Sequence, residues 1–163
     1  MRSKKQFVTN ILEGETWYKI PEYKIMMVRD NKDTVSNTKS IKNPGDANAV
    51  MQSYLSGADR EHFAVILLNR KNGIIGINTV SIGDLSSSIV HPREVFNPAI
   101  VAGANAIILA HNHPSGDPAP SDADIDVTIR LADAGEILGV QVLDHIVIGD
   151  NNRFVSLKEK GCF

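Results

Sequence analysis

The stretch that most constrains the fold is the sequence NAIILAHNH at residues 105–113, which is bounded by a proline. An apolar run of this length, ended by a proline, is typical of a strand buried inside a sheet. A helical pattern follows this strand closely. Ser121 opens a helix that is expected to reach about Ala134, with Gly135 or Gly139 as stop signals. The chain is therefore expected to fold around a sheet with helices packed against it.

The remainder of the chain after residue 46 alternates between helix and strand patterns. Asp46 is expected to cap a first helix, in which apolar residues recur at helical spacing until Gly57. Asn72 and Gly73 form a strong hairpin signal between two strand patterns. The other expected elements are strands over 62–68, 74–82, 140–148 and 153–157 and a helix over roughly 93–104 that starts after Pro92. This order predicts a single α+β (α/β-like) domain: a mixed β-sheet with helices against it and at least one crossover.

The first 40 residues carry weaker signals. Residues 1–20 show no clear periodicity and are expected to form a lead-in or a packing arm. The sequence EYKIMMVRD at 22–30 is compatible with a strand, and residues 31–46 are polar and typical of a connection. We therefore expect an N-terminal extension over 1–40 and one domain over 41–163.

Composition excludes some classes of function. The 163 residues suit one domain, and the formal net charge of −2, with Lys and Arg scattered apart from RSKK at the start, does not indicate non-specific nucleic-acid binding. No apolar run approaches the roughly 20 residues that span a bilayer, and no signal-peptide pattern is visible. The single cysteine, Cys162, excludes an internal disulfide. Cytoplasm is the expected compartment, without a membrane association.

Two histidines at the end of the buried run carry the first chemical signal. Residues i and i+2 of a strand share a face, so His111 and His113 are expected to present their imidazoles side by side. Neutral imidazole is a good Zn²⁺ ligand, but catalytic zinc usually has three protein ligands and a water. The nearest third ligand is Asp124, one turn into the next helix, and the proline-rich loop PSGDPAP would stiffen the return toward it.

A purely structural interpretation explains part of the same stretch. Ser121 and Asp124 have the spacing of a capping box, although Asp is shorter than the usual Glu or Gln. Carboxylates at a helix start are also favoured by the helix dipole. The two interpretations are compatible, because Ser121 can cap the helix while Asp124 binds a metal.

The amino-acid sequences of several segments resemble those of a known family. The stretch HNHPSGDPAPSDAD resembles the JAMM (MPN+) metalloprotease motif, and it has His111, His113, Ser121 and Asp124 at that motif's spacing. Together with SSSIVHPREVFNPAI and LDHIVIG, it is similar to the RadC family in particular, over roughly residues 41–163. The resemblance implies an MPN/JAB-type sheet sandwiched by helices, resembling the cytidine-deaminase-like fold.

The resemblance also implies an activity. It implies Zn²⁺ bound by His111, His113 and Asp124 with water as fourth ligand, a glutamate as general base, and Ser121 stabilising the oxyanion. Zinc lowers the pKa of its bound water to about 7 in such sites. The expected reaction is hydrolysis of an amide bond, peptide or isopeptide, in a peptide or protein substrate.

Two glutamates compete for the role of the base. Glu61 in REHFAVILL precedes an early strand, as the resemblance implies, and we favour it; its alternative is a solvated charge beside Arg60. Glu94 is the competitor, but it is expected on the first turn of a helix, where the helix dipole already explains a carboxylate.

Other polar residues and other functions stay open. His145, after Asp144 in LDHIVIG, is expected to be a partly buried structural histidine near the sheet edge, with orientation of a zinc ligand as the alternative. Asp117 in the loop could contact substrate or serve the turn. A DNA-repair or recombination factor and a non-catalytic zinc-binding module are the rival functions. Residues 1–45 lack the helix-hairpin-helix region that RadC proteins often carry, which weakens the DNA hypothesis. Homodimerisation also stays open.

Overall fold

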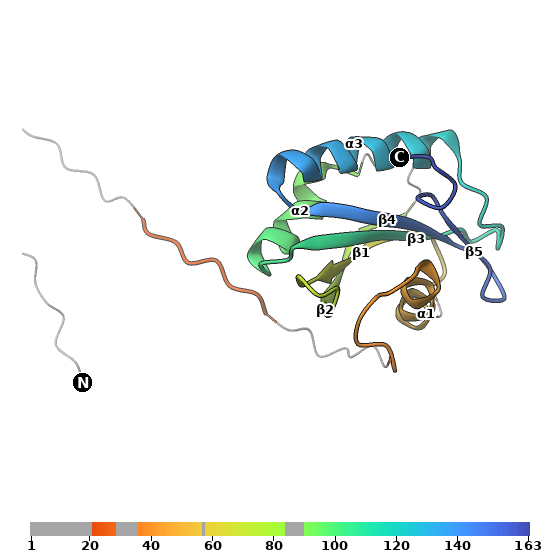
Figure 1. Cartoon of the computed structure of the whole chain (residues 1–163), viewed down its shortest axis with the longest axis horizontal. Helices are drawn as coiled ribbons and strands as arrows, with labels where there is room; N and C mark the ends of the chain where they lie inside the picture. Colours follow the sequence, from red (N-terminus) through yellow and green to blue (C-terminus); the bar gives the residue numbers. More distant parts are fainter. Residues whose placement is uncertain (1–20, 29–35, 57, 84–89) are drawn as a thin grey trace, which may run out of the picture.

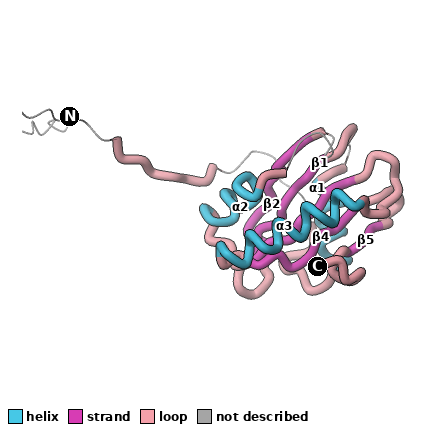
Figure 2. The backbone as a smooth tube through the Cα atoms, turned by 90° about the horizontal axis from the view of Figure 1, so that it is seen from above, coloured by secondary structure: helices cyan, strands magenta, loops and turns pink. Residues whose placement is uncertain are grey.

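The computed structural model describes residues 21–28, 36–56, 58–83 and 90–163, and in these ranges the expected α+β architecture is present. The elements follow in the order α1 (Pro44–Tyr54), β1 (His62–Leu68), β2 (Ile74–Ile82), α2 (Pro92–Val101), β3 (Ala106–Asn112), α3 (Asp122–Leu138), β4 (Gln141–Ile148) and β5 (Phe154–Ser156). This is the predicted order of helices and strands. Helices α2 and α3 cover one face of the sheet and α1 covers the other (Figure 1), and the view from above shows α2 and α3 lying over the sheet (Figure 2).

The five-stranded sheet has the order β2-β1-β3-β4-β5. Among the described strands, β3 and β4 run parallel and the other neighbouring pairs are antiparallel. The pairs β1–β2 and β4–β5 are hairpins, whereas β1 and β3 pair although β2 and α2 lie between them in the sequence. The parallel pair is joined by α3, which is the expected crossover. Strand β3 therefore lies at the centre of the sheet, and the chain leaves its carboxyl end directly into the loop that precedes α3.

Alternate residues of the central strands supply two separate hydrophobic clusters. On β1, Phe63 and Val65 pack with α2 and α3, whereas Ala64 and Ile66 pack with α1. Every residue of β1 from position 63 to 68 is buried, because both faces of the strand are covered. The continuous apolar runs in the sequence reflect this double coverage, and they leave His111 on the α3 side of the sheet together with Phe63.

The helix boundaries correct two expectations. Asp46 is not the N-cap of α1: Asn43 is, and its side chain accepts a hydrogen bond from the Asp46 amide, with Pro44 in the first turn. Helix α3 continues past the expected Ala134 to Leu138, and it ends at Gly139, one of its two expected stop signals, whose φ of 70° is left-handed. Gly135 lies inside the helix. The prediction that Gly57 ends α1 concerns a residue outside the described ranges; α1 reaches Tyr54, with Leu55 as its C-cap.

The N-terminal extension also differs from one expectation. Residues 21–28 are exposed and have no strand pairing, so the described part of 22–30 is not a strand. These residues run away from the folded part of the chain (orange in Figure 1), and the apolar composition of KIMMV was a misleading strand signal because no neighbouring strand pairs with it. Residues 1–20 and the serines at 86–88 lie outside the described residues. None of the described helices is long and apolar enough to cross a bilayer.

The two glycines near the end of α3 should respond differently to alanine. Gly139→Ala should lower the free energy of unfolding by about 1 kcal/mol, because an L residue is strained at its left-handed φ although no atom lies within 4 Å of the added Cβ. Gly135→Ala should cost about 1–3 kcal/mol, because its Cβ would lie 2.5 Å from the Val140 carbonyl oxygen and 3.1 Å from the Phe96 ring. Urea unfolding curves would measure both, and a stabilising Gly135→Ala would contradict the packing described here.

Candidate metal centre

The carboxyl end of β3 presents two imidazoles to the same side of the sheet. The side chain of His111 is completely buried and that of His113 is 19% exposed, with their Nε2 atoms 3.0 Å apart. Strand alternation places them together, as predicted from the sequence. The Nδ1 atom of His113 lies 2.7 Å from the Asp117 carbonyl oxygen in the following loop. This contact fixes the ring of His113, and it shows that Asp117 meets the site through its backbone.

The first turn of α3 brings Asp124 to these imidazoles. Its Oδ1 is 3.3 Å from Nε2 of His111 and its Oδ2 is 3.6 Å from Nε2 of His113. The capping box is also present: the Ser121 hydroxyl accepts from the Asp124 amide, and the Ser121 amide donates to Oδ2 of Asp124. The Ser121 hydroxyl donates to the same Oδ2 at 2.7 Å. Capping and a place among the candidate ligands therefore coexist in one side chain.

Glu61 reaches the two histidines from the side of the neighbouring strand β1, which pairs with β3. It precedes β1, its side chain is 17% exposed, and its Oε1 lies 4.0 Å from Nε2 of His111. The competing Glu94 lies in the first turn of α2, is largely exposed and pairs with Arg93. Of the two glutamates, the structure therefore brings only Glu61 to the histidines.

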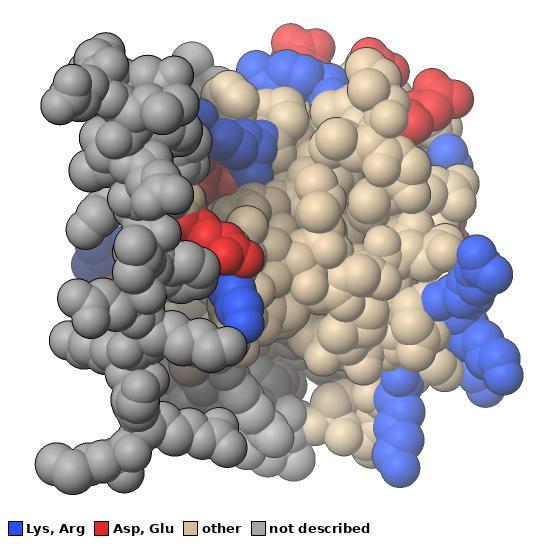
Figure 3. Space-filling view, turned by 90° about the vertical axis from the view of Figure 1, so that its left-hand side faces the viewer, with Lys and Arg blue, Asp and Glu red and all other residues tan. Residues whose placement is uncertain are grey.

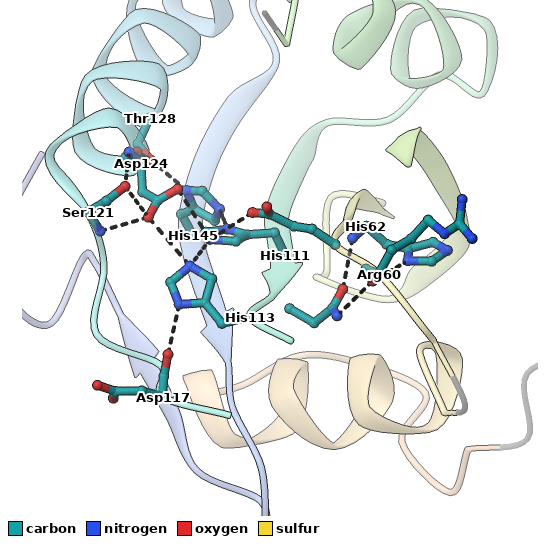
Figure 4. Close-up of polar contacts among 11 residues, drawn as sticks. Arg60, His62, His111, His113, Asp117, Ser121, Asp124, Thr128 and His145 are labelled. Carbon is teal, nitrogen blue, oxygen red and sulfur yellow. Dashed lines mark hydrogen bonds and ion pairs between the residues drawn. The ribbon is translucent and has the colours of Figure 1, made fainter. Parts of the chain in front are cut away.

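Four potential ligand atoms converge in this way. Glu61, His111, His113 and Asp124 each offer one ligand atom, and these atoms lie within 4.8 Å of one another. Figure 4 shows His111, His113 and Asp124 pointing toward one another from the end of β3 and the start of α3. The spacing predicted for the metal ligands is thus matched by their positions, while their roles, and that of Ser121 toward an oxyanion, stay predictions.

The nitrogen and oxygen atoms of these four side chains are suited to bind a cation. The Asp117 carbonyl can only accept a hydrogen bond, so Nδ1 of His113 carries a proton and Nε2 of the neutral ring is a lone pair. That lone pair faces Nε2 of His111 at 3.0 Å, and two carboxylates stand beside them. Such a cluster of electron pairs and negative charge is unfavourable unless a cation, either a proton or a metal ion, lies between its members. Nitrogen and carboxylate ligands in this number suit Zn²⁺ among other transition metals.

Electrostatics within the cluster perturb two groups. Burial alone would raise the pKa of Asp124, but the hydrogen bond and charge of His111, with further hydrogen bonds from Ser121, hold that pKa well below its usual value. Burial, followed by the charge of His111, lowers the pKa of His145 below the usual range for histidine. The site therefore combines an ionised aspartate with a neutral buried imidazole.

Asn112, the residue between the two histidines, has a role that the sequence pattern did not reveal. It points away from them, and its amide closes two hydrogen bonds around Glu61: Oδ1 accepts from the His62 amide at 2.9 Å, and Nδ2 donates to the Arg60 carbonyl at 3.1 Å. The backbone on both sides of Glu61 is therefore tied to β3 just beyond the paired strands (Figure 4). The amide side chain, which offers both a donor and an acceptor, was the only available signal.

The turn between β4 and β5 stabilises the proline-rich loop that lies between β3 and α3. The Arg153 guanidinium donates to the Gly116 carbonyl at 2.6 Å, and the Asp150 amide donates to the same oxygen. Gly116 has a φ of 78°, and a Cβ there would lie 2.3 Å from the Asp150 carboxylate. The turn between β4 and β5 thus packs directly on the proline-rich loop. Away from that turn, Asp144 on β4 holds the end of β5 by accepting from the Ser156 hydroxyl and the Lys158 amide.

Comparison with known proteins agrees with this architecture. Residues 41–162 match the model of the RadC-like JAB domain. The chain belongs to this family. Its RadC-like JAB domain is 56% identical over 121 residues to a UPF0758 protein of Desulfitobacterium hafniense, which covers 74% of this chain and 53% of the relative. A UPF0758 protein of Staphylococcus haemolyticus is 50% identical over 138 residues, covering 85% of this chain and 58% of the relative.

The similarity covers only part of each of these relatives. The chain spans about half the length of the curated relatives that it matches. A third, from Caldanaerobacter subterraneus, is 55% identical over 124 residues, again 53% of its own length. The likeness therefore shows a common family, whereas the names of these relatives state no reaction.

Removal of the Asn112 amide should loosen the strand end that carries Glu61. Asn112→Ala loses both hydrogen bonds and should lower the free energy of unfolding by about 1–2 kcal/mol. It should also accelerate hydrogen exchange of the His62 amide, which NMR can follow residue by residue. Asn112→Asp, which keeps the acceptor for His62 but not the donor for Arg60, is the matched control and should protect that amide better. Unchanged exchange in Asn112→Ala would show that the strand pairing alone holds this segment.

Proposed function

We propose that this RadC-like JAB domain is a zinc-dependent hydrolase of amide bonds, either peptide or isopeptide. The convergence of Glu61 with His111, His113 and Asp124 carries this proposal. The two histidines and Asp124 would hold the metal, because His111 lies in β3, His113 directly follows that strand, Asp124 lies in the first turn of α3, and their ligand atoms face one another. A bound zinc ion would supply Lewis acidity and lower the pKa of a water molecule toward neutrality.

The protein's own groups account for the remaining chemistry. Glu61 is close to the histidines yet partly open to solvent, so it is placed to take a proton from the attacking water and to deliver it to the leaving amine. The Ser121 hydroxyl donates to Asp124 Oδ2 in this structure, and it would turn toward the substrate oxygen as negative charge develops there. His113 is exposed enough to mark the open side of the site.

The charge distribution favours a peptide over DNA as the substrate. The formal net charge is −2, and on the face drawn in Figure 3 basic and acidic side chains are scattered around an uncharged area. DNA-binding surfaces usually gather Lys and Arg in one patch. Salt-dependent gel shifts separate the alternatives: binding that persists at physiological salt with a steep salt dependence would favour the DNA-associated function.

Metal binding is the first test. The purified protein, loaded with Zn²⁺ and dialysed, should retain about one zinc per chain, measured by atomic emission. His113→Ala should weaken zinc binding by more than about 100-fold, because even partners of metal ligands contribute 10- to 100-fold. A protein that retains no zinc, or a His113→Ala variant that binds it as tightly as the wild type, would contradict the assignment.

The two glutamates provide a matched pair for activity. A library of quenched fluorescent peptides and isopeptide-linked substrates should yield hydrolysis that a chelator abolishes and Zn²⁺ restores. Glu61→Gln should retain zinc and lower kcat by about 10²- to 10⁴-fold, the usual contribution of a general base. Glu94→Gln, an exposed glutamate away from the cluster, should change neither. Loss of activity in Glu94→Gln but not in Glu61→Gln would contradict the proposed mechanism.

A further inference from the structure

The imidazole of His145 is buried directly behind the metal centre. None of its side chain is exposed, and its Nε2 lies 2.8 Å from Nδ1 of His111. Its other nitrogen, Nδ1, hydrogen-bonds the hydroxyl of Thr128, and that hydroxyl also contacts the backbone carbonyl of Asp124. Figure 4 shows this series of contacts extending from α3 to β3 behind His111.

The carbonyl at the end of the series determines where its protons lie. A carbonyl oxygen only accepts, so the single hydroxyl proton of Thr128 must point to Asp124. The Thr128 oxygen then accepts from Nδ1 of His145, which leaves Nε2 of that neutral ring as a lone pair. This lone pair in turn requires the proton of His111 to be on Nδ1. The reverse assignment would leave the Thr128 oxygen facing the carbonyl oxygen at hydrogen-bond distance with no proton between them, which is unfavourable.

We infer that Thr128 and His145 are positioning residues that hold His111 in the Nδ1–H tautomer, with its Nε2 lone pair directed at the metal centre. The inference rests on the proposed metal site and adds to it the group that prepares one ligand. A metal-binding histidine commonly donates its second N–H to a carboxylate or a carbonyl. In this chain a second imidazole takes that place, and it can accept only because Thr128 occupies its other nitrogen.

The same series links two ligands. Thr128 lies one helical turn after Asp124 on α3, so the hydroxyl that orients the His145 ring is fixed to the residue that supplies the third ligand. Phe63 confines both rings, stacked on His111 at 6.2 Å between centroids and edge-on to His145 at 5.3 Å. A shift of α3 would therefore change the tautomer of His111 as well as the position of Asp124.

Thr128→Val tests this inference without touching the metal ligands. Valine has the shape of threonine but no hydroxyl, so Nδ1 of His145 loses its acceptor and the ring is free to carry its proton on Nε2, against His111. Zinc affinity, measured by competition with a chromophoric chelator, should fall about 10-fold or more. Thr128→Ser keeps the hydroxyl and should restore affinity close to that of the wild type. Equal affinities in Thr128→Val and the wild type would overturn the inference.

The tautomers can also be observed directly in the zinc-loaded wild-type protein. Long-range ¹H–¹⁵N NMR spectra distinguish a protonated ring nitrogen from a lone pair, and contacts to Thr128 protons assign the His145 ring. The expected pattern is Nδ1–H for both His145 and His111. An Nε2–H tautomer of His145 would overturn the inference while leaving the zinc site intact, even if Thr128→Val failed to fold. A wild-type protein that binds no zinc would overturn the proposed function, and the inference with it.

Discussion

The pairing of β1 with β3 is the constraint on which the site depends. Phe63 lies opposite His111 in this antiparallel pair, so the residues just before β1 come to lie beside the residues at the end of β3. Glu61 is thereby brought next to the histidines across 50 positions of sequence. Asn112 continues the pairing with its side chain where the backbone ladder ends. A slip of one residue would turn Glu61 away and exchange the two hydrophobic clusters, so the buried faces of both strands protect this register.

The central position of β3 explains how polar groups are tolerated at its end. Both faces of the strand are covered, and His111 and His145 are completely buried on the α3 side. Buried polar atoms are costly unless they have partners, and each ring nitrogen of His145 has one. The partners of His111 are His145 on one side and the cluster of ligands on the other. Burial therefore makes the arrangement of protons and charges in the site highly specific.

Much of the site could be predicted from local spacing, because local geometry is enough to determine it. Two histidines two residues apart on a strand share a face, and Ser121 with Asp124 occupies the first turn of the following helix. Long-range partners are different. The preference for Glu61 over Glu94 depended on a family resemblance, and the role of Asn112 depended on a register that no local pattern specifies.

The sequence predictions that the structure corrects failed for physical reasons. Asp46 is a good capping residue in isolation, but Asn43 precedes Pro44, and a proline in the first helical turn moves the cap upstream. The apolar stretch within 22–30 has strand composition, yet a strand needs a neighbour, and none pairs with residues 21–28. For His145, the structural and the functional interpretations were posed as alternatives. Its two hydrogen bonds satisfy a buried ring, and the same two bonds would orient His111 in the proposed metal centre.

The carboxylate of Asp124 resolves the other apparent choice, between helix cap and metal ligand. Its two oxygens have different neighbours: Oδ2 accepts from the amide and the hydroxyl of Ser121, while Oδ1 faces Nε2 of His111. The capping box holds the carboxylate in one rotamer, and the ionised form that a metal requires is the form that these hydrogen bonds favour. A longer glutamate would still reach the amide of the N-cap but would move the second oxygen away from the histidines. The short aspartate at this position is therefore explained by the proposed metal centre and not by capping alone.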